Sequence, residues 1–66
     1  MLFRVLKSDG DTFRIPLGED ESRKRALALA QEHHDAGEAV QVYRVLDSGI
    51  ELLEASGYPG EEFMIT

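Results

Sequence analysis

Apolar and polar residues alternate along two short stretches near the start of the chain, which is the pattern of β-strands with one buried face. The first stretch carries Phe3 and Val5, and the second carries Phe13 and Ile15. The turn-forming sequence Ser-Asp-Gly occupies residues 8–10 between them. We therefore expect the chain to open with a β-hairpin.

The register of this hairpin follows from its turn. If Gly10 takes the left-handed conformation at the end of a three-residue loop, Val5 faces Phe13 and Lys7 faces Asp11. That register gathers the apolar side chains on one face and sets opposite charges across from each other. A two-residue loop would shift every pair by one position, so we favour the three-residue loop.

Three acids at residues 19–21 stand at the start of a stretch with helical periodicity. Carboxylates are favoured in the first turn of a helix, so they mark its beginning. The helix is expected from Glu19 or Asp20 to Ala36, and Gly37 suits the left-handed position that ends a helix. Acids precede bases by four residues three times in its first turns, which stabilises a helix. Its small and apolar stripe comprises Ala26, Leu27, Leu29, Ala30 and His33.

A second hairpin follows, built from residues 39–46 and 50–55 around Asp-Ser-Gly at 47–49. The order hairpin, helix, hairpin predicts an α+β protein, a two-layer ββαββ sandwich with one helix packed on a four-stranded, mainly antiparallel sheet. Residues 1–56 form this single domain. Residues 57–66 are a C-terminal tail, which becomes either a fifth strand or an interface arm.

The opening layout is similar to that of β-grasp, ubiquitin-like domains, which also begin with a hairpin followed by a helix. The resemblance covers residues 1–30 and is topological, since no sequence motif carries it. It implies an alternative fold in which the sheet is mixed. The chain ends in Met64-Ile65-Thr66 rather than in the diglycine that ubiquitin uses for conjugation.

Composition narrows the class of protein. The chain has 66 residues, no cysteine and a formal net charge of −6. The absence of cysteine fits a reducing compartment, and charged residues interrupt the N-terminal segment, so we expect a cytoplasmic protein without a membrane segment. A net negative charge repels a phosphate backbone and disfavours binding to nucleic acid.

The second hairpin is apolar on both faces, whereas one helix can cover only one face of a sheet. If Tyr43 and Val45 face the helix, the other face presents a patch of leucine, valine and arginine that suits a protein interface. The cover is either the C-terminal tail of the same chain or a second copy in a symmetric dimer. The candidate interface residues are Leu2, Leu6, Val42, Arg44, Leu46, Leu52, Phe63, Met64 and Ile65.

Arginines on the sheet raise an alternative, because an open sheet face can also present basic side chains to nucleic acid. The candidates are Arg4, Arg14 and Arg44. We expect Arg44 to reach water or to pair with a carboxylate such as Glu54, because burying an unpaired charge is costly.

No residues form a convincing catalytic or metal site. Adjacent helical residues diverge by about 100°, so His33 and His34 cannot both face one ion. His34 and Glu38 have suitable spacing but supply at most two ligands. Residues 9–11 (Asp-Gly-Asp) are a turn rather than a calcium loop. No nucleophile motif or phosphate loop occurs, so we expect no catalytic residues, no cofactor and no metal.

These observations favour a small, acidic, non-enzymatic protein-interaction or accessory module that self-associates or binds a protein partner. Nucleic-acid binding through the arginine-bearing face is the alternative.

Overall fold

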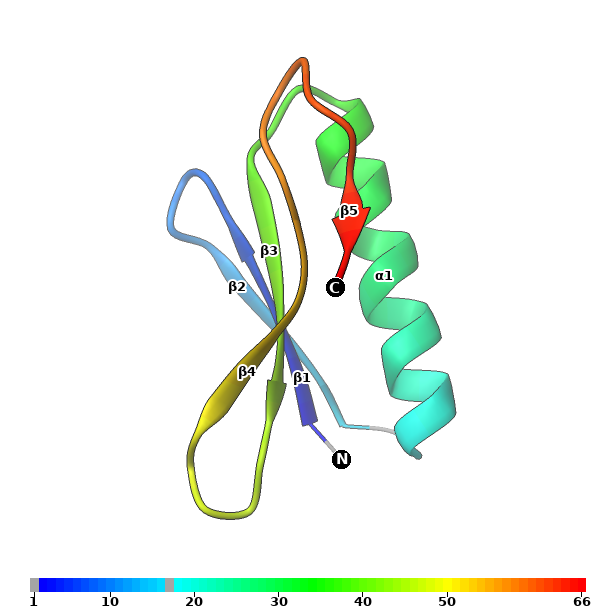
Figure 1. Ribbon diagram of the computed structural model, residues 1–66, viewed down its shortest axis with the longest axis vertical. Helices are drawn as coiled ribbons and strands as arrows, with labels where there is room; N and C mark the ends of the chain where they lie inside the picture. The colour runs from blue at the N-terminus through cyan, green and yellow to red at the C-terminus, as the bar shows by residue number, and fades with distance from the viewer. Residues whose placement is uncertain (1, 17) are drawn as a thin grey trace.

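A computed structural model, which describes residues 2–16 and 18–66, has one helix lying against one face of a twisted sheet (Figure 1). The elements are β1 (Leu2–Lys7), β2 (Thr12–Pro16), α1 (Glu19–Asp35), β3 (Val40–Val45), β4 (Glu51–Gly57) and β5 (Met64–Ile65). The strand order is β2-β1-β3-β4-β5, and every neighbouring pair is antiparallel. The ββαββ prediction is confirmed, and the tail supplies a fifth strand. The mixed sheet of the β-grasp alternative is not formed.

The first hairpin has the predicted register. Phe3 pairs with Ile15, and Val5 pairs with Phe13. Gly10 has a φ of 85°, and the amide of Lys7 donates to the carbonyl of Asp11 at 3.0 Å. The left-handed glycine therefore sets the register that places these apolar side chains on one face.

The helix begins at Glu19 as predicted and ends at Asp35, one residue before the predicted end, and Gly37 follows with a φ of 93°. Two of the charged residues in its first turns form ion pairs with the sheet. Arg23 lies 3.5 Å from Glu54, and Glu19 lies 3.4 Å from Arg44. The charges at the helix N-terminus thus also orient α1 across β3 and β4.

The core lies between α1 and the sheet and depends on small helical side chains. Ser22, Ala26 and Ala30 are fully buried, as are Phe3 and Val5 of the facing strand β1. Small residues let the helix backbone approach the sheet closely, so medium-sized strand side chains fill the layer between them.

The face of β3 that meets the helix is the opposite of the one we considered from the sequence. Val42 is 0% exposed and lies in the core, opposite Val5 of β1, while Tyr43 and Val45 lie on the other face. This choice keeps the tyrosine hydroxyl out of the apolar layer, where it would need a buried partner. The hydroxyl instead donates to Gln41 Oε1 at 3.0 Å.

A β-bulge changes the side-chain alternation of β4. Tyr43 pairs with Leu53 and Val42 pairs with Ala55, so Glu54 is an extra residue without an opposite partner. The bulge returns Ala55 to the buried face, and the Glu54 carboxylate approaches Arg23 of α1 and Arg44 of β3.

The C-terminal segment is attached to the helix through His34. Its Nε2 donates to the carbonyl of Tyr58 at 2.9 Å, and its ring centroid lies 5.9 Å from that of Phe63. A Cβ at Gly57 would lie 2.8 Å from His34 Cδ2 and 3.1 Å from Phe63 Cδ2. Close contact at Gly57 therefore holds the end of β4, the helix and the tail together.

We predict that Gly57→Ala destabilises the protein by about 1–3 kcal/mol, because the added methyl group forces His34 or Phe63 to move in a packed region. Urea denaturation followed by circular dichroism measures the change in the free energy of unfolding.

The matched control uses the same substitution in a His34→Ala background, where the nearest clashing atoms are removed. The cost of Gly57→Ala should be smaller there. An equal cost in both backgrounds would show that contact with His34 is not its cause.

Candidate functional site

The face of the sheet that turns away from α1, called the open face below, is the candidate site. Strand registers place its residues in three rows that run across β2, β1, β3 and β4. The first row holds Leu2, Val45 and Glu51, the second Arg14, Arg4, Tyr43 and Leu53, and the third Thr12, Leu6, Gln41 and Ser56. Leucine, valine and tyrosine side chains thus mix with arginines at its centre.

Arg4 crosses the open face from β1 to β4. Its Nε donates to Glu51 Oε1 at 2.9 Å and its Nη2 donates to Glu51 Oε2 at 2.5 Å. On the way the guanidinium passes 4.8 Å from the centroid of the Tyr43 ring. The bidentate pair and the cation–π contact together link β1, β3 and β4 across the centre of the open face.

The electrostatics of this pair follow from its geometry. The hydrogen bonds from Arg4 lower the pKa of the Glu51 carboxyl from its ordinary value of 4.5, although desolvation opposes this. Because the pKa is lowered in the folded state, the pair contributes to stability above the ordinary carboxyl range. That contribution is lost as the pH falls through the lowered pKa.

Arg14 lies beside Arg4 on β2, and within the described part of the chain it forms no ion pair. Its exposed guanidinium is therefore available at the edge of the open face. With Arg4 and Glu51 it gives this face a positive balance, whereas the whole chain carries −6.

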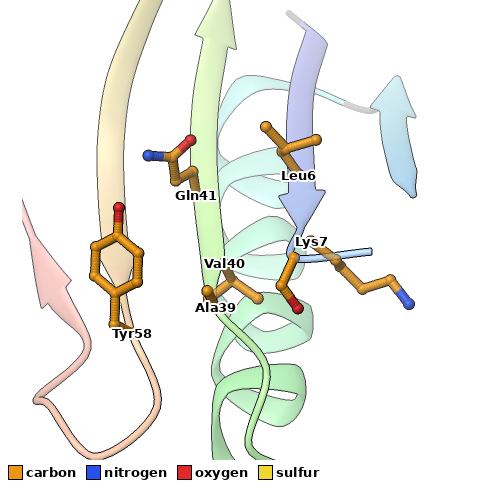
Figure 2. A pocket seen from close by; sticks show the side chains of 7 residues that line it. Leu6, Lys7, Ala39, Val40, Gln41 and Tyr58 are labelled. Atoms are coloured by element: carbon orange, nitrogen blue, oxygen red, sulfur yellow. The ribbon is translucent and has the colours of Figure 1, made fainter. Parts of the chain in front are cut away.

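A shallow pocket of about 210 Å³ indents one end of the open face (Figure 2). Residues of β3 line its centre, with Leu6 of β1 on one side and Tyr58, which follows β4, on the other. Lys7, Ser8, Gln41 and Tyr58 contribute polar groups, but most of the exposed lining is apolar. A pocket of this size fits one side chain of a protein partner and is smaller than typical small-molecule sites.

The structure separates the sequence-derived interface candidates. Leu2 and Leu6 lie half-buried on the open face. The expected placement of Val42 and Arg44 on that face is wrong, because both belong to the helix side of β3. Arg44 Nε lies 3.1 Å from Glu54, as expected, although the poor alignment makes this an ion pair rather than a hydrogen bond.

The remaining candidates lie elsewhere. Leu46 and Leu52 share the helix-side face of the second hairpin but lie near its tip. Phe63 packs against the core, while Met64 and Ile65 are exposed on β5. The sequence-derived list omitted Tyr43, Val45 and Leu53, which occupy the open face. Along β3, Tyr43 and Val45 alternate with Val40 and Val42, which indicates two apolar faces. The pattern did not show which of these two pairs of residues faces the helix.

The three arginines of the nucleic-acid alternative do not meet on one surface. Arg4 and Arg14 are neighbours on the open face, whereas Arg44 pairs with Glu19 and Glu54 on the opposite side.

The two histidines diverge as helical geometry requires. His33 Nδ1 donates to Glu38 at 2.6 Å and its ring stacks on Phe13, while His34 contacts the tail. It is thus His33, not His34, that pairs with Glu38. Among the described residues, no group of three or more histidine, cysteine or acidic side chains is arranged to hold a metal ion.

We predict that Arg4→Met raises the pKa of Glu51 toward its ordinary value, because the charged hydrogen-bond donor is removed. Carboxyl ¹³C chemical shifts followed through an acid titration measure this pKa. Arg14→Met is the control and should have a smaller effect, because Arg14 influences Glu51 only through longer-range attraction. An unchanged Glu51 pKa in Arg4→Met would contradict the bidentate pair.

No helix in the ranges 2–16 and 18–66 has the length and apolar character needed to cross a bilayer. The chain matches no protein-family model, and comparisons with curated proteins and with solved structures find no significant match. The functional argument therefore depends on the open face itself.

Proposed function

We propose that this protein is a non-enzymatic interaction module of the cytoplasm that self-associates as a two-fold dimer through the open face. The observation that carries the proposal is that leucine, valine and tyrosine side chains gather on a sheet face that α1 does not cover. Uncovered apolar patches of this kind mark interfaces. The absence of cysteine is in keeping with the proposed compartment.

The strand order makes the open face suited to a second copy. Consider two copies whose open faces meet, related by a two-fold axis that is parallel to the strands and midway between β1 and β3. This axis places β1 of one copy over β3 of the other, and β2 over β4. Leu2 of one copy then lies over Val45 of the other, and Arg14 lies over Leu53. The same operation repeats both contacts, so the pairing closes on itself.

Charge supports this arrangement. The open face places Arg14 on β2 and Glu51 on β4, so exchanging these strands brings the unpaired arginine toward the carboxylate of the second copy. The chain as a whole carries a net charge of −6, so a face with a positive balance reduces the repulsion between two copies.

The size of the face sets the expected strength. Four strands about 4.8 Å apart, with about five residues rising roughly 3.4 Å each, cover on the order of 300 Å² in projection. Stable interfaces bury about 800 Å² per partner, so the proposed dimer is weak and exchanges rapidly. A Kd of tens to hundreds of micromolar, corresponding to about 5–6 kcal/mol, is expected.

We predict that Leu53→Lys abolishes dimerisation whereas Ile65→Lys preserves it. Leu53 is 42% exposed and Ile65 is 58% exposed, so neither substitution is expected to disturb the core. Both variants change the net charge equally, but only residue 53 faces Arg14 of the second copy. Sedimentation equilibrium from about 10 μM to 1 mM, a range that brackets the expected Kd, measures the mass.

A wild-type protein that remains monomeric over this range would overturn the proposal. Loss of the dimer in Ile65→Lys but not in Leu53→Lys would place the interface on the tail instead. Nucleic-acid binding would show itself as affinity for duplex or single-stranded DNA that weakens steeply with salt.

A further inference from the structure

The outer edge of β4 is only partly covered by β5. The two strands pair at Ala55 with Ile65 and at Ser56 with Met64. Thr66 then contributes the last contacts, donating its amide to the carbonyl of Glu54 and its hydroxyl to the carbonyl of Leu53 at 2.8 Å. Beyond Thr66, no described strand pairs with the first half of β4 on this side.

The backbone of this edge offers hydrogen-bonding groups to a further strand. At the hairpin turn, the amide of Leu46 donates to the carbonyl of Ile50 at 2.9 Å, so these two residues form a hydrogen-bonded pair. Such pairs alternate with non-hydrogen-bonded pairs in an antiparallel ladder. The next pair is Val45 with Glu51, and the N–H and C=O of Glu51 therefore point away from β3.

The side chains along the edge are exposed and alternate in character. Ile50, which is 58% exposed, and Leu52 lie on the helix side, while Glu51 lies on the open face. Figure 1 shows this hairpin extending past the N-terminal end of α1, so the helix does not shield its tip. A strand added here would need apolar side chains beside Ile50 and Leu52 and a basic side chain beside Glu51.

The opposite edge of the sheet is protected in the ways that natural proteins use. On β2, Arg14 places a charge on the edge strand and Pro16 lacks a backbone donor. The exposed part of β4 has no proline, and its one charge is paired with Arg4. The two edges therefore differ in their capacity to accept another strand.

We propose that the free edge of β4 at Glu51 and Leu52 binds an extended segment of another protein whose apolar and basic side chains alternate. The segment lies in line with β5, antiparallel to β4, and its backbone pairs with the outward N–H and C=O of Glu51. The carboxylate of Asp47 in the hairpin turn favours basic residues in the segment. The backbone contacts of this site lie on the edge of the sheet, whereas the side chain of Glu51 lies on the open face that the proposed dimer uses.

The test uses a seven-residue peptide of alternating lysine and valine, with both ends neutralised, titrated into ¹⁵N-labelled protein. A peptide of the same composition with its four lysines and three valines in separate blocks controls for attraction to an acidic protein. The proposal predicts tighter binding of the alternating peptide and slower hydrogen exchange at the amide of Glu51. Equal binding of both peptides, or an unprotected Glu51 amide at saturation, would overturn it.

Two variants at one position separate the backbone contact from the charge. Glu51→Pro removes the outward N–H, which makes no hydrogen bond to β3. The affinity for the alternating peptide should fall roughly tenfold or more, because a peptide carbonyl loses its donor. Glu51→Ala keeps the N–H and should bind within about threefold of wild type, because a surface ion pair contributes little. Equal affinity of the two variants for the alternating peptide would contradict the backbone contact. If Glu51→Pro fails to fold, hydrogen exchange at the Glu51 amide of the wild-type protein, with and without peptide, tests the same contact.

Discussion

The second hairpin of the sheet is apolar on both faces, but α1 covers only one of them. The rest of the structure depends on this constraint. Ser22, Ala26 and Ala30 let α1 lie close to the sheet, so Val42 and the apolar side chains of β1 fill the layer between them. The larger Tyr43 is then left on the other side. Because no second helix is present among the described residues, the open face must be stabilised by its own side chains or by another molecule.

The chain stabilises this face in part by itself. Arg4 reaches from β1 across Tyr43 to Glu51 on β4, and this contact links strands that are not neighbours. A charged side chain placed over an aromatic ring keeps its head hydrated while its methylene groups cover apolar surface. The pair leaves Leu53 and the pocket beside Leu6 uncovered, and these parts of the face support the proposed interface.

Local chemistry made much of the fold predictable from the sequence. Alternation and the left-handed Gly10 predicted the pairing of Val5 with Phe13, and Gly37 marked the end of the helix. The side of β3 that meets the helix was not predictable, because valines and a tyrosine alternate there and both sets are apolar. That ambiguity placed Val42 and Arg44 wrongly on the open face. The bulge at Glu54 was also hidden, since it depends on pairing between strands and not on local pattern.

The central claim, that the open face is the surface through which two copies meet, is tested most directly by following the backbone amide shifts of ¹⁵N-labelled wild-type protein during dilution. The account predicts concentration-dependent shifts at Leu2, Tyr43, Val45 and Leu53, with none on the outer helix face around Lys24 and Ala28. Shifts that are absent at every concentration, or that are confined to the helix, would contradict it.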